Sequence, residues 1–164
     1  ILRYFNASGA LRDGSLGEIH TPETHIIPIA IDVALGNQKE FILYGNDYET
    51  PDGTCIRDYI HVLDLADAHI LAALRLQSGG ESFTVNLGVG TGYSNLEILS
   101  MIEEVTGKKI PYAVYPRRSG DPAKIFADNK KAKELLGWSP KYSDLATIIS
   151  SAWKWHSDFK KEGI

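Results

Sequence analysis

Cysteine is nearly absent from this sequence, and long apolar runs are absent altogether. A single cysteine, Cys55, cannot form a disulfide within the chain, so the composition fits a reducing compartment and predicts a cytoplasmic protein. No apolar run reaches the roughly 18 residues that a membrane-spanning helix needs. We therefore expect neither a fold held by disulfides nor a partner membrane.

Basic residues and metal-ligand patterns are also scarce. The chain has 17 Lys and Arg residues against 21 Asp and Glu residues, a net charge of -4. Nucleic-acid partners require concentrated positive charge, so this balance argues against them. The five histidines and the single cysteine show no spacing typical of metal ligands, and the sequence therefore predicts no metal site.

The length and composition are those of one globular unit. The 164 residues suffice for one sizeable core and are too few for two complete ones. Hydrophobic residues make up 43% and charged residues 23%, which is ordinary for a globular domain. The sequence opens inside an apolar run without an initiating methionine. We therefore expect a piece of a longer protein.

Strand-like and helix-like segments alternate along the chain, which predicts an α/β fold. β-Branched and aromatic residues mark strands at residues 1–5, 41–44, 54–56, 81–87 and 109–115. Helices are expected at residues 62–76, 96–105, 130–136 and from about residue 143. A further helix is predicted to begin at Thr21-Pro22, because threonine suits an N-cap and proline the first helical position.

Two of these helices carry specific signals. Ser94 and Glu97 have the spacing of a capping box, which predicts the start of the helix that follows. The 62–76 helix is expected to bury an apolar stripe at helical spacing, formed by Leu63, Ala66, Ile70, Ala73 and Leu74.

A glycine-rich turn follows the strand at residues 81–87. Gly88, Gly90 and Gly92 lie between a strand and a helix, as in dinucleotide-binding proteins. The spacing is GxGxG rather than GxGxxG, and no acidic residue ends a second strand about 20 residues further on. We therefore interpret the turn as structural.

Arginines follow two of the strand-like runs and enter turns. Arg57 comes after residues 54–56, and Arg117 and Arg118 come after residues 109–115, with Asp121 close behind. Arginine binds phosphate oxygens in a bidentate manner, and a nearby carboxylate accepts hydrogen bonds from ribose hydroxyls. The residues suggest a nucleotide diphosphate site. Salt bridges that serve structure, such as one between Arg57 and Asp58, explain them equally well.

Two polar residues elsewhere have similarly open interpretations. Asn6 ends the strand at residues 1–5, where an open α/β sheet places ligands, but it could equally cap its own turn. His25 falls in the expected first turn of the helix after Pro22, where free backbone N–H groups favour anions, although a lone histidine there is more often a surface residue.

Several motifs in order resemble the C-terminal half of UDP-glucose 4-epimerases, which are extended short-chain dehydrogenase/reductases. They are RYFN-x-x-GA at residues 3–10, YGNDY at 44–48, RDYIHV-x-DLA-x-AH at 57–69, NLG-x-G at 86–90 and PRR-x-GD at 116–121. The resemblance covers nearly the whole chain.

The resemblance implies a set of site residues. The nucleotide sugar would contact Asn6, His25 and Ile26, and uracil would lie against Ile42, Leu43 and Tyr44. Diphosphate and ribose would be held by Arg57, Arg118 and Asp121. Tyr4 and Phe5 would face the nicotinamide end of NAD. Some members carry an aromatic residue after the GD turn where this chain has Ile125, so the resemblance implies no aromatic contact at this position.

The resemblance also implies a fold and an activity. The chain would be one substrate-binding domain, 1–164, in which residues 1–10 and 81–92 contribute strands and turns of the parent Rossmann-like sheet. The parent would be a cytoplasmic, homodimeric, NAD-dependent enzyme of galactose metabolism that epimerises the sugar C4 of UDP-glucose and UDP-galactose through a 4-keto intermediate.

The catalytic parts of that family are not in this sequence. The NAD-binding N-terminal half is absent, and no tyrosine here has a lysine four residues later. We expect no catalytic residue in the chain and no activity from it alone. Two alternatives remain open: a related nucleotide-sugar epimerase or dehydratase acting on an N-acetylhexosamine or a uronic acid, and a non-catalytic UDP-binding module.

The strand at residues 2–5 and the strand at residues 83–87 are apolar at nearly every position, which is typical of strands covered on both faces. The resemblance implies that they are the last two strands of the dinucleotide-binding sheet, and we therefore expect them to pair in parallel. An apolar edge left free beside residues 2–5 would favour self-association.

Overall fold

Strands and helices alternate through the chain in a computed structural model, which describes residues 1–159. The order is β1 (Leu2–Tyr4), β2 (Asn6–Ser8), α1 (Ile26–Ala34), β3 (Phe41–Tyr44), β4 (Ile56–Arg57), β5 (Tyr59–His61), α2 (Val62–Gln77), β6 (Val85–Leu87), β7 (Tyr93–Ser94), α3 (Asn95–Thr106), β8 (Tyr112–Tyr115), β9 (Lys124–Ile125), α4 (Lys130–Leu136) and α5 (Leu145–Phe159). This order confirms the α/β prediction. Within the described residues, every helix is too short or too polar to cross a bilayer.

The strands form four small sheets. Three of them are parallel pairs, β1 with β6, β2 with β5 and β3 with β8. In the fourth, β4 lies between antiparallel β7 and parallel β9. The pairing of Leu2 with Val85 and of Tyr4 with Leu87 confirms the predicted parallel contact between these two strands.

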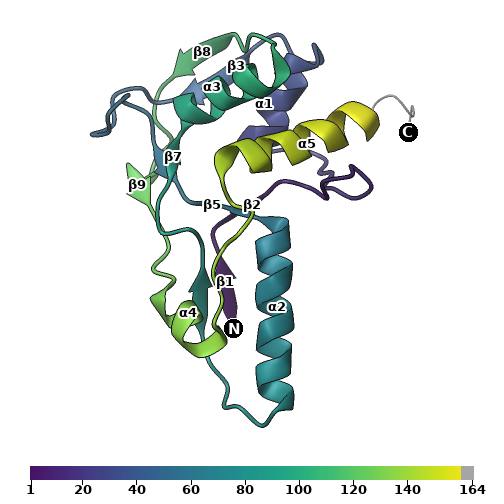
Figure 1. Cartoon of the computed structure of the whole chain (residues 1–164). Coiled ribbons are helices and arrows are strands. Elements are labelled where there is room, and N and C mark those ends of the chain that lie inside the picture. Colours follow the sequence, from purple (N-terminus) through teal and green to yellow (C-terminus); the bar gives the residue numbers. More distant parts are fainter. Residues whose placement is uncertain (160–164) are drawn as a thin grey trace.

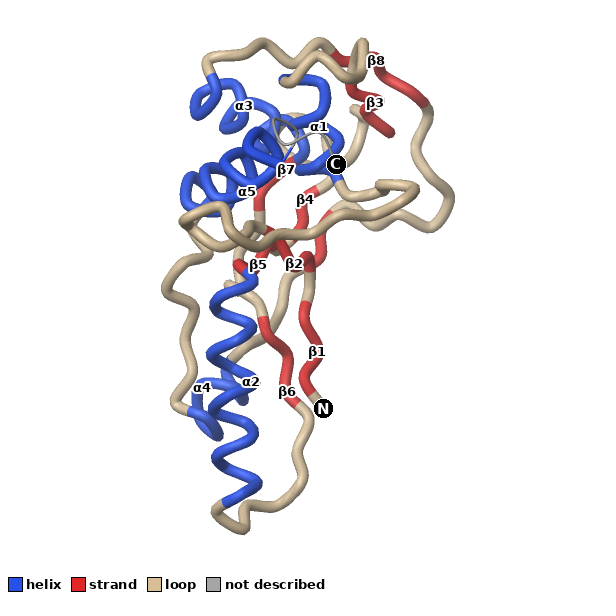
Figure 2. The backbone as a smooth tube through the Cα atoms, turned by 90° about the vertical axis from the view of Figure 1, so that its right-hand side faces the viewer, coloured by secondary structure: helices blue, strands red, loops and turns tan. Residues whose placement is uncertain are grey.

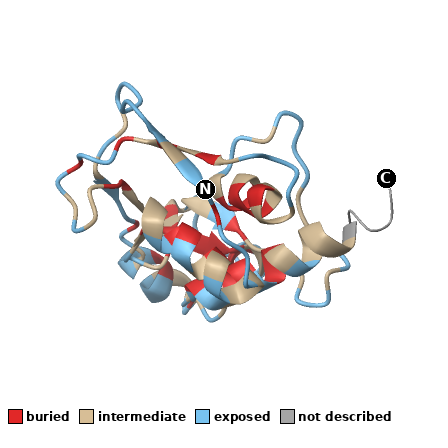
Figure 3. Ribbon diagram, turned by 90° about the horizontal axis from the view of Figure 1, so that it is seen from above, coloured by how far each residue is buried: buried red, intermediate tan, exposed pale blue. Residues whose placement is uncertain are grey.

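The elements gather in two groups along the long axis of the molecule. Figures 1 and 2 show α1, α3 and α5 at one end with β3 and β8, and α2, α4, β1 and β6 at the other, with β2 and β5 between them. Each group has its own hydrophobic cluster, one around Ile31 and Ile148 and a smaller one around Leu87 and Trp138. Figure 3 shows the buried positions concentrated where helices pack and the exposed ones on the surrounding loops.

The helix starts are set by local hydrogen bonds. Ser94 Oγ accepts from the Glu97 N–H at 3.1 Å, and Glu97 Oε2 accepts from the Ser94 N–H at 2.7 Å, which confirms the capping box. The predicted helix start at Thr21-Pro22 is wrong, because α1 begins at Ile26 with His25 as its N-cap. Glu23 Oε1 accepts from the N–H groups of residues 24 and 25, which holds this segment as a turn.

Helix α2 has nearly the predicted bounds but buries a different face. Leu65, Ala68 and Ala72 are buried, whereas Ile70 and Leu74 of the expected stripe are more than half exposed. Buried Asp64 gives the physical reason. Its carboxylate accepts from the N–H groups of residues 141 and 142 at 2.7 and 2.9 Å and from the Ser143 hydroxyl, and this turns its side of α2 inward.

Strand β1 is less covered than its apolar sequence predicts. Leu2 is half-buried, and Arg3 and Tyr4 are exposed. Among the described residues only β6 pairs with β1, so the second edge of β1 has no neighbouring strand. The expectation that β1 is covered on both faces does not hold for these residues.

The carboxylate of Asp58 ties three segments together. It is fully buried and accepts from the N–H groups of Val89 at 2.8 Å, Gly90 at 2.9 Å and Ala127 at 3.0 Å. A Cβ at Gly88 would lie 2.6 Å from Asp58 Oδ2 and 2.5 Å from the Ala127 Cβ, so only glycine fits there. The glycine turn therefore serves Asp58 through its backbone, in agreement with the structural interpretation of GxGxG.

We predict that Asp58→Asn destabilises the chain by about 1.5–3 kcal/mol, because the amide nitrogen would face backbone N–H donors that now reach a charged acceptor. Urea unfolding followed by circular dichroism measures this change. Asp67→Asn is the matched control. Its side chain is 42% exposed and 3.8 Å from Lys141 Nζ, so the expected change stays within about 0.5 kcal/mol. Equal stability of the two variants would contradict the role given to Asp58.

We also predict that this chain self-associates through the free edge of β1, because unpaired backbone groups on an apolar strand are a template for strand addition. Light scattering across a concentration series should show dimers or larger species, and amides of residues 2–5 should exchange slowly with solvent. A strict monomer at high concentration with fast exchange at these amides would refute the prediction.

Candidate functional site

A cavity of about 730 Å³ lies where β2, β3, β4, α5 and the loop before α1 meet. Its walls come from segments far apart in the sequence, including residues 6–9, 23–29, 118, 152 and 155–156. The parallel strands bring their carboxyl ends to this region, as open α/β sheets do at ligand sites.

Asn6 is held at the cavity wall by its neighbour strand. Its backbone N–H donates to the Asp58 carbonyl at 3.0 Å, and its side-chain Nδ2 donates to the same oxygen at 2.9 Å. The alternative in which Asn6 caps its own turn is therefore wrong. The contact instead links β2 to the start of β5.

Arg57 pairs with Asp121, 64 residues further along the chain. Its Nη2 donates to Asp121 Oδ1, and its Nη1 donates to the Ile56 carbonyl at 2.8 Å. The side chain is only 13% exposed, which places the charge at the inner wall of the cavity. The alternative pairing with Asp58 is wrong, because Asp58 is occupied by backbone donors.

Neighbouring Arg117 and Arg118 have different surroundings. Arg117 Nε donates to Asp47 Oδ1 at 2.6 Å, and its guanidinium lies 4.2 Å from the centre of the Tyr48 ring. The Arg117 hydrogen bond holds the pKa of the exposed Asp47 carboxyl below its usual value. Arg118 lies 4.1 Å from the centre of the Tyr44 ring and lines the cavity, which Arg117 does not.

The structure brings most of the predicted nucleotide-sugar residues to this one cavity. Those at its wall are Asn6, His25, Ile26, Ile42, Tyr44, Arg57, Arg118 and Asp121. Leu43 is 1% exposed, packs in the hydrophobic core and is not part of the wall. Tyr4 and Phe5, predicted to face NAD, are not part of this wall. Tyr4 is exposed, and its ring centre lies 5.9 Å from that of His69.

Several lining residues carry no signal in the sequence. Cys55, Asn95 and Gln38 line the cavity, and none belongs to a motif that points to the site. Burial raises the pKa of the Cys55 thiol, which stays neutral beside Asn95 Nδ2 at 3.4 Å. Only the three-dimensional meeting of β4 and α3 places Cys55 and Asn95 at the cavity, and Gln38 reaches it from the loop between α1 and β3.

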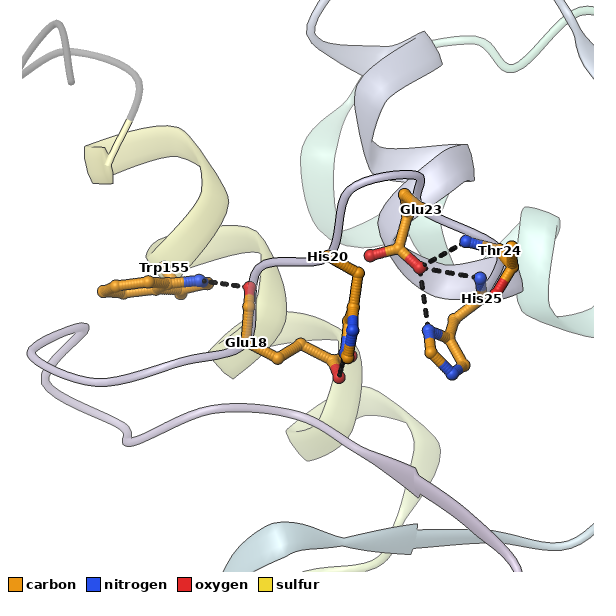
Figure 4. A network of polar contacts seen from close by, with 6 residues as sticks. All are labelled: Glu18, His20, Glu23, Thr24, His25 and Trp155. Atoms are coloured by element: carbon orange, nitrogen blue, oxygen red, sulfur yellow. Dashed lines mark hydrogen bonds and ion pairs between the residues drawn. The ribbon is translucent and has the colours of Figure 1, made fainter.

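The loop before α1 adds a polar group to the same cavity (Figure 4). Glu18 Oε2 lies 3.0 Å from His20 Nε2, and Glu23 Oε1 lies 2.7 Å from His25 Nδ1. Burial raises the pKa of Glu23, but hydrogen bonds from the backbone and ring of His25 and from the Thr24 N–H lower it further, and the net shift is downward. Glu18, Glu23 and His25 line the cavity.

Comparison with known proteins agrees with this geometry. A family model described as GDP-mannose 4,6 dehydratase matches residues 1–150. A UDP-glucose 4-epimerase of Streptococcus mutans is 53% identical over 160 residues, which is 98% of this chain and 48% of the relative.

Solved structures give the same result. UDP-glucose 4-epimerase from Brucella ovis in complex with NAD is 55% identical with a TM-score of 0.90, covering 93% of this chain and 47% of that one. The Bifidobacterium longum enzyme in complex with NAD⁺ and UDP is 43% identical with a TM-score of 0.89, covering 96% and 47%.

The chain thus spans about half the length of the relatives it matches. The family match, in contrast, extends over residues 1–150 of the 164 and includes every predicted site residue. The chain therefore belongs to the family described as GDP-mannose 4,6 dehydratase, among the short-chain dehydrogenase/reductases.

Proposed function

We propose that this chain is the UDP-sugar-binding half of an NAD-dependent UDP-glucose 4-epimerase. The observation that carries the proposal is the shared cavity wall formed by Arg57, Arg118 and Asp121 together with Asn6 and the β3 side chains. The identity of 53% to an enzyme of that name, and the NAD⁺ and UDP complex of a structural relative, support the same assignment.

The two arginines at the wall suit a diphosphate. Arg57 uses Nη1 and Nη2 for Ile56 and Asp121, and a guanidinium has five N–H donors, so others remain for phosphate oxygens. Arg118 lies against the Tyr44 ring, which limits its freedom before a ligand arrives. Asp121 would accept from ribose hydroxyls while it fixes Arg57.

Strand β3 suits a base. Ile42 and Tyr44 alternate with buried Phe41 and Leu43, and both line the cavity. Within the described residues β3 pairs only with β8. The N–H groups of Phe41 and Gly45 donate to the carbonyls of residues 111 and 115, so the alternating backbone groups of Ile42 and Tyr44 face the other edge of β3, which has no strand partner. Apolar side chains and free backbone groups together would hold the face and the edge of uracil.

The described residues do not fit the pyrophosphate of NAD. The N–H groups of Val89 and Gly90 in the glycine turn donate to Asp58 and are not free for phosphate oxygens. Tyr4 and Phe5 would therefore meet only the nicotinamide end of a cofactor held by the rest of the parent enzyme. The role of this chain is to bind the nucleotide at a distance from the reacting carbon, and alone it should not catalyse.

The proposal also includes a cytoplasmic location and a homodimeric parent enzyme. The free thiol of Cys55 supports a reducing compartment.

The description of the matching family supports a nucleotide-sugar 4,6-dehydratase as the second candidate, with the same nucleotide-binding role for this chain. Product analysis of the full-length parent with UDP-glucose separates the two, because an epimerase gives UDP-galactose and a dehydratase a 4-keto-6-deoxy sugar.

We predict that this chain binds UDP weakly and NAD hardly at all, because it has the diphosphate arginines without a free dinucleotide cradle. Calorimetric titration with UDP, UDP-glucose and NAD measures the three affinities under one condition. NAD affinity in the micromolar range would overturn the division of roles proposed here.

We further predict that Arg57→Ala and Arg118→Ala each weaken UDP binding by about 1.5–3 kcal/mol, roughly 10- to 150-fold in Kd, because each removes a charge-assisted partner of the diphosphate. The measurement is UDP titration of the full-length enzyme.

Arg117→Ala is the matched control for these variants, since Arg117 pairs with Asp47 outside the cavity wall. Its Kd should change little. If Arg57→Ala and Arg118→Ala bind UDP as tightly as the parent, the diphosphate assignment is wrong.

A further inference from the structure

Three potential metal ligands converge on the loop before α1. One ligand atom from each of Glu18, His20 and His25 lies within 4.8 Å of the others. The ring centres of His20 and His25 are 4.9 Å apart. Figure 4 shows the three side chains on the same side of the loop.

The separations are close to those of a zinc site. Bonds of roughly 2.0–2.2 Å in tetrahedral geometry place two ligand atoms about 3.3–3.6 Å apart. Glu18 Oε2 and His20 Nε2, at 3.0 Å, are already near that separation. The side chains of His20 and His25 are 46% and 52% exposed, so small torsional changes can close the remaining gap.

Glu23 supplies an independent sign of metal binding. Its carboxylate lies 2.7 Å from His25 Nδ1, and the same oxygen accepts from two backbone N–H groups, which fixes it in place. Metal-ligating histidines usually donate one ring N–H to a carboxylate in this way, which orients the ring and increases its basicity. The contact leaves Nε2 of His25 as the nitrogen directed away from Glu23.

Contacts with α5 fix the backbone of the loop before α1 without a bound ion. Trp155 Nε1 donates to the Glu18 carbonyl at 3.0 Å. A Cβ at Gly17 would lie 2.3 Å from the Trp155 ring, so the backbone packs directly on the indole. This contact with α5 fixes the backbone that carries Glu18, which lowers the entropy cost of gathering the ligands.

We propose that Glu18, His20 and His25 bind one divalent transition-metal ion, of the Zn²⁺, Co²⁺ or Ni²⁺ class, with Glu23 as a positioning residue. Imidazole ligands favour these ions over Mg²⁺ and Ca²⁺. Three protein ligands leave a fourth coordination position, and Glu18 and His25 place it at the cavity wall. The Glu-x-His-x₄-His pattern in residues 18–25 is the sequence signal, and the expectation of no metal ligands overlooks it.

The test uses the untagged chain after removal of metal by a chelator. Titration with Co²⁺ should give the visible absorption of four-coordinate cobalt, saturating at about one ion per chain, and Zn²⁺ should displace it. Calorimetry with Mg²⁺ should give no comparable binding. Failure of both Co²⁺ and Zn²⁺ to bind would overturn the proposal.

Variants identify the ligands. His20→Ala and Glu18→Gln should each abolish the cobalt spectrum, and Glu23→Gln should weaken Zn²⁺ binding about 10- to 100-fold, as for other residues that orient a metal ligand. His69→Ala removes an exposed histidine elsewhere and should leave binding unchanged. Circular dichroism of each variant verifies the fold. Unchanged Zn²⁺ binding in both His20→Ala and Glu18→Gln, or an equal loss in His69→Ala, would contradict the assignment.

Discussion

The buried carboxylate of Asp58 connects the segments that carry the candidate site. The carboxylate oxygens accept from backbone N–H groups of the glycine turn and of residue 127. The backbone carbonyl of Asp58 accepts two hydrogen bonds from Asn6. Arg57 precedes it directly, so the position of that guanidinium depends on the same anchor. A buried carboxylate requires hydrogen-bond donors for its oxygens, and backbone N–H groups provide them here.

The glycines beside this anchor have a packing role. Gly92 approaches the Arg57 carbonyl so closely that a Cβ would lie 2.7 Å from it, and Gly88 meets Asp58 and Ala127. Both permit the 88–94 segment to pass next to β4. The glycines at positions 88 and 92 therefore support the candidate nucleotide site through close packing beside Arg57 and Asp58.

Local signals in the sequence predicted local structure well. The capping box at Ser94 and the extent of α2 follow from side-chain type and spacing, whereas the parallel β1–β6 pair was implied by the resemblance. Long-range polar contacts could not be predicted in this way. Asp64 selects the buried face of α2 through residues 141–143, and Asp121 selects Arg57 across 64 residues. Periodicity contains no information on either contact.

At the candidate site, too, some residues could be predicted from the sequence and others only from the fold. The resemblance predicted the site residues one by one, and the fold places most of them at one cavity. It gave no indication that Cys55 and Asn95 share this wall or that Glu18 and His20 meet beside it. The side chain of Leu43 points into the core because strand side chains alternate, so Leu43 does not line the cavity as the resemblance implied.

The most direct test of the central claim is a map of amide chemical-shift changes in this chain on titration with UDP. If one cavity holds the nucleotide, the largest changes should cluster at residues 25–26, 42–45, 57 and 118–121, with α2 and β6 nearly unaffected. Changes centred on the 88–92 turn and the exposed face of β1, with residues 42–45 and 118–121 unmoved, would contradict the account.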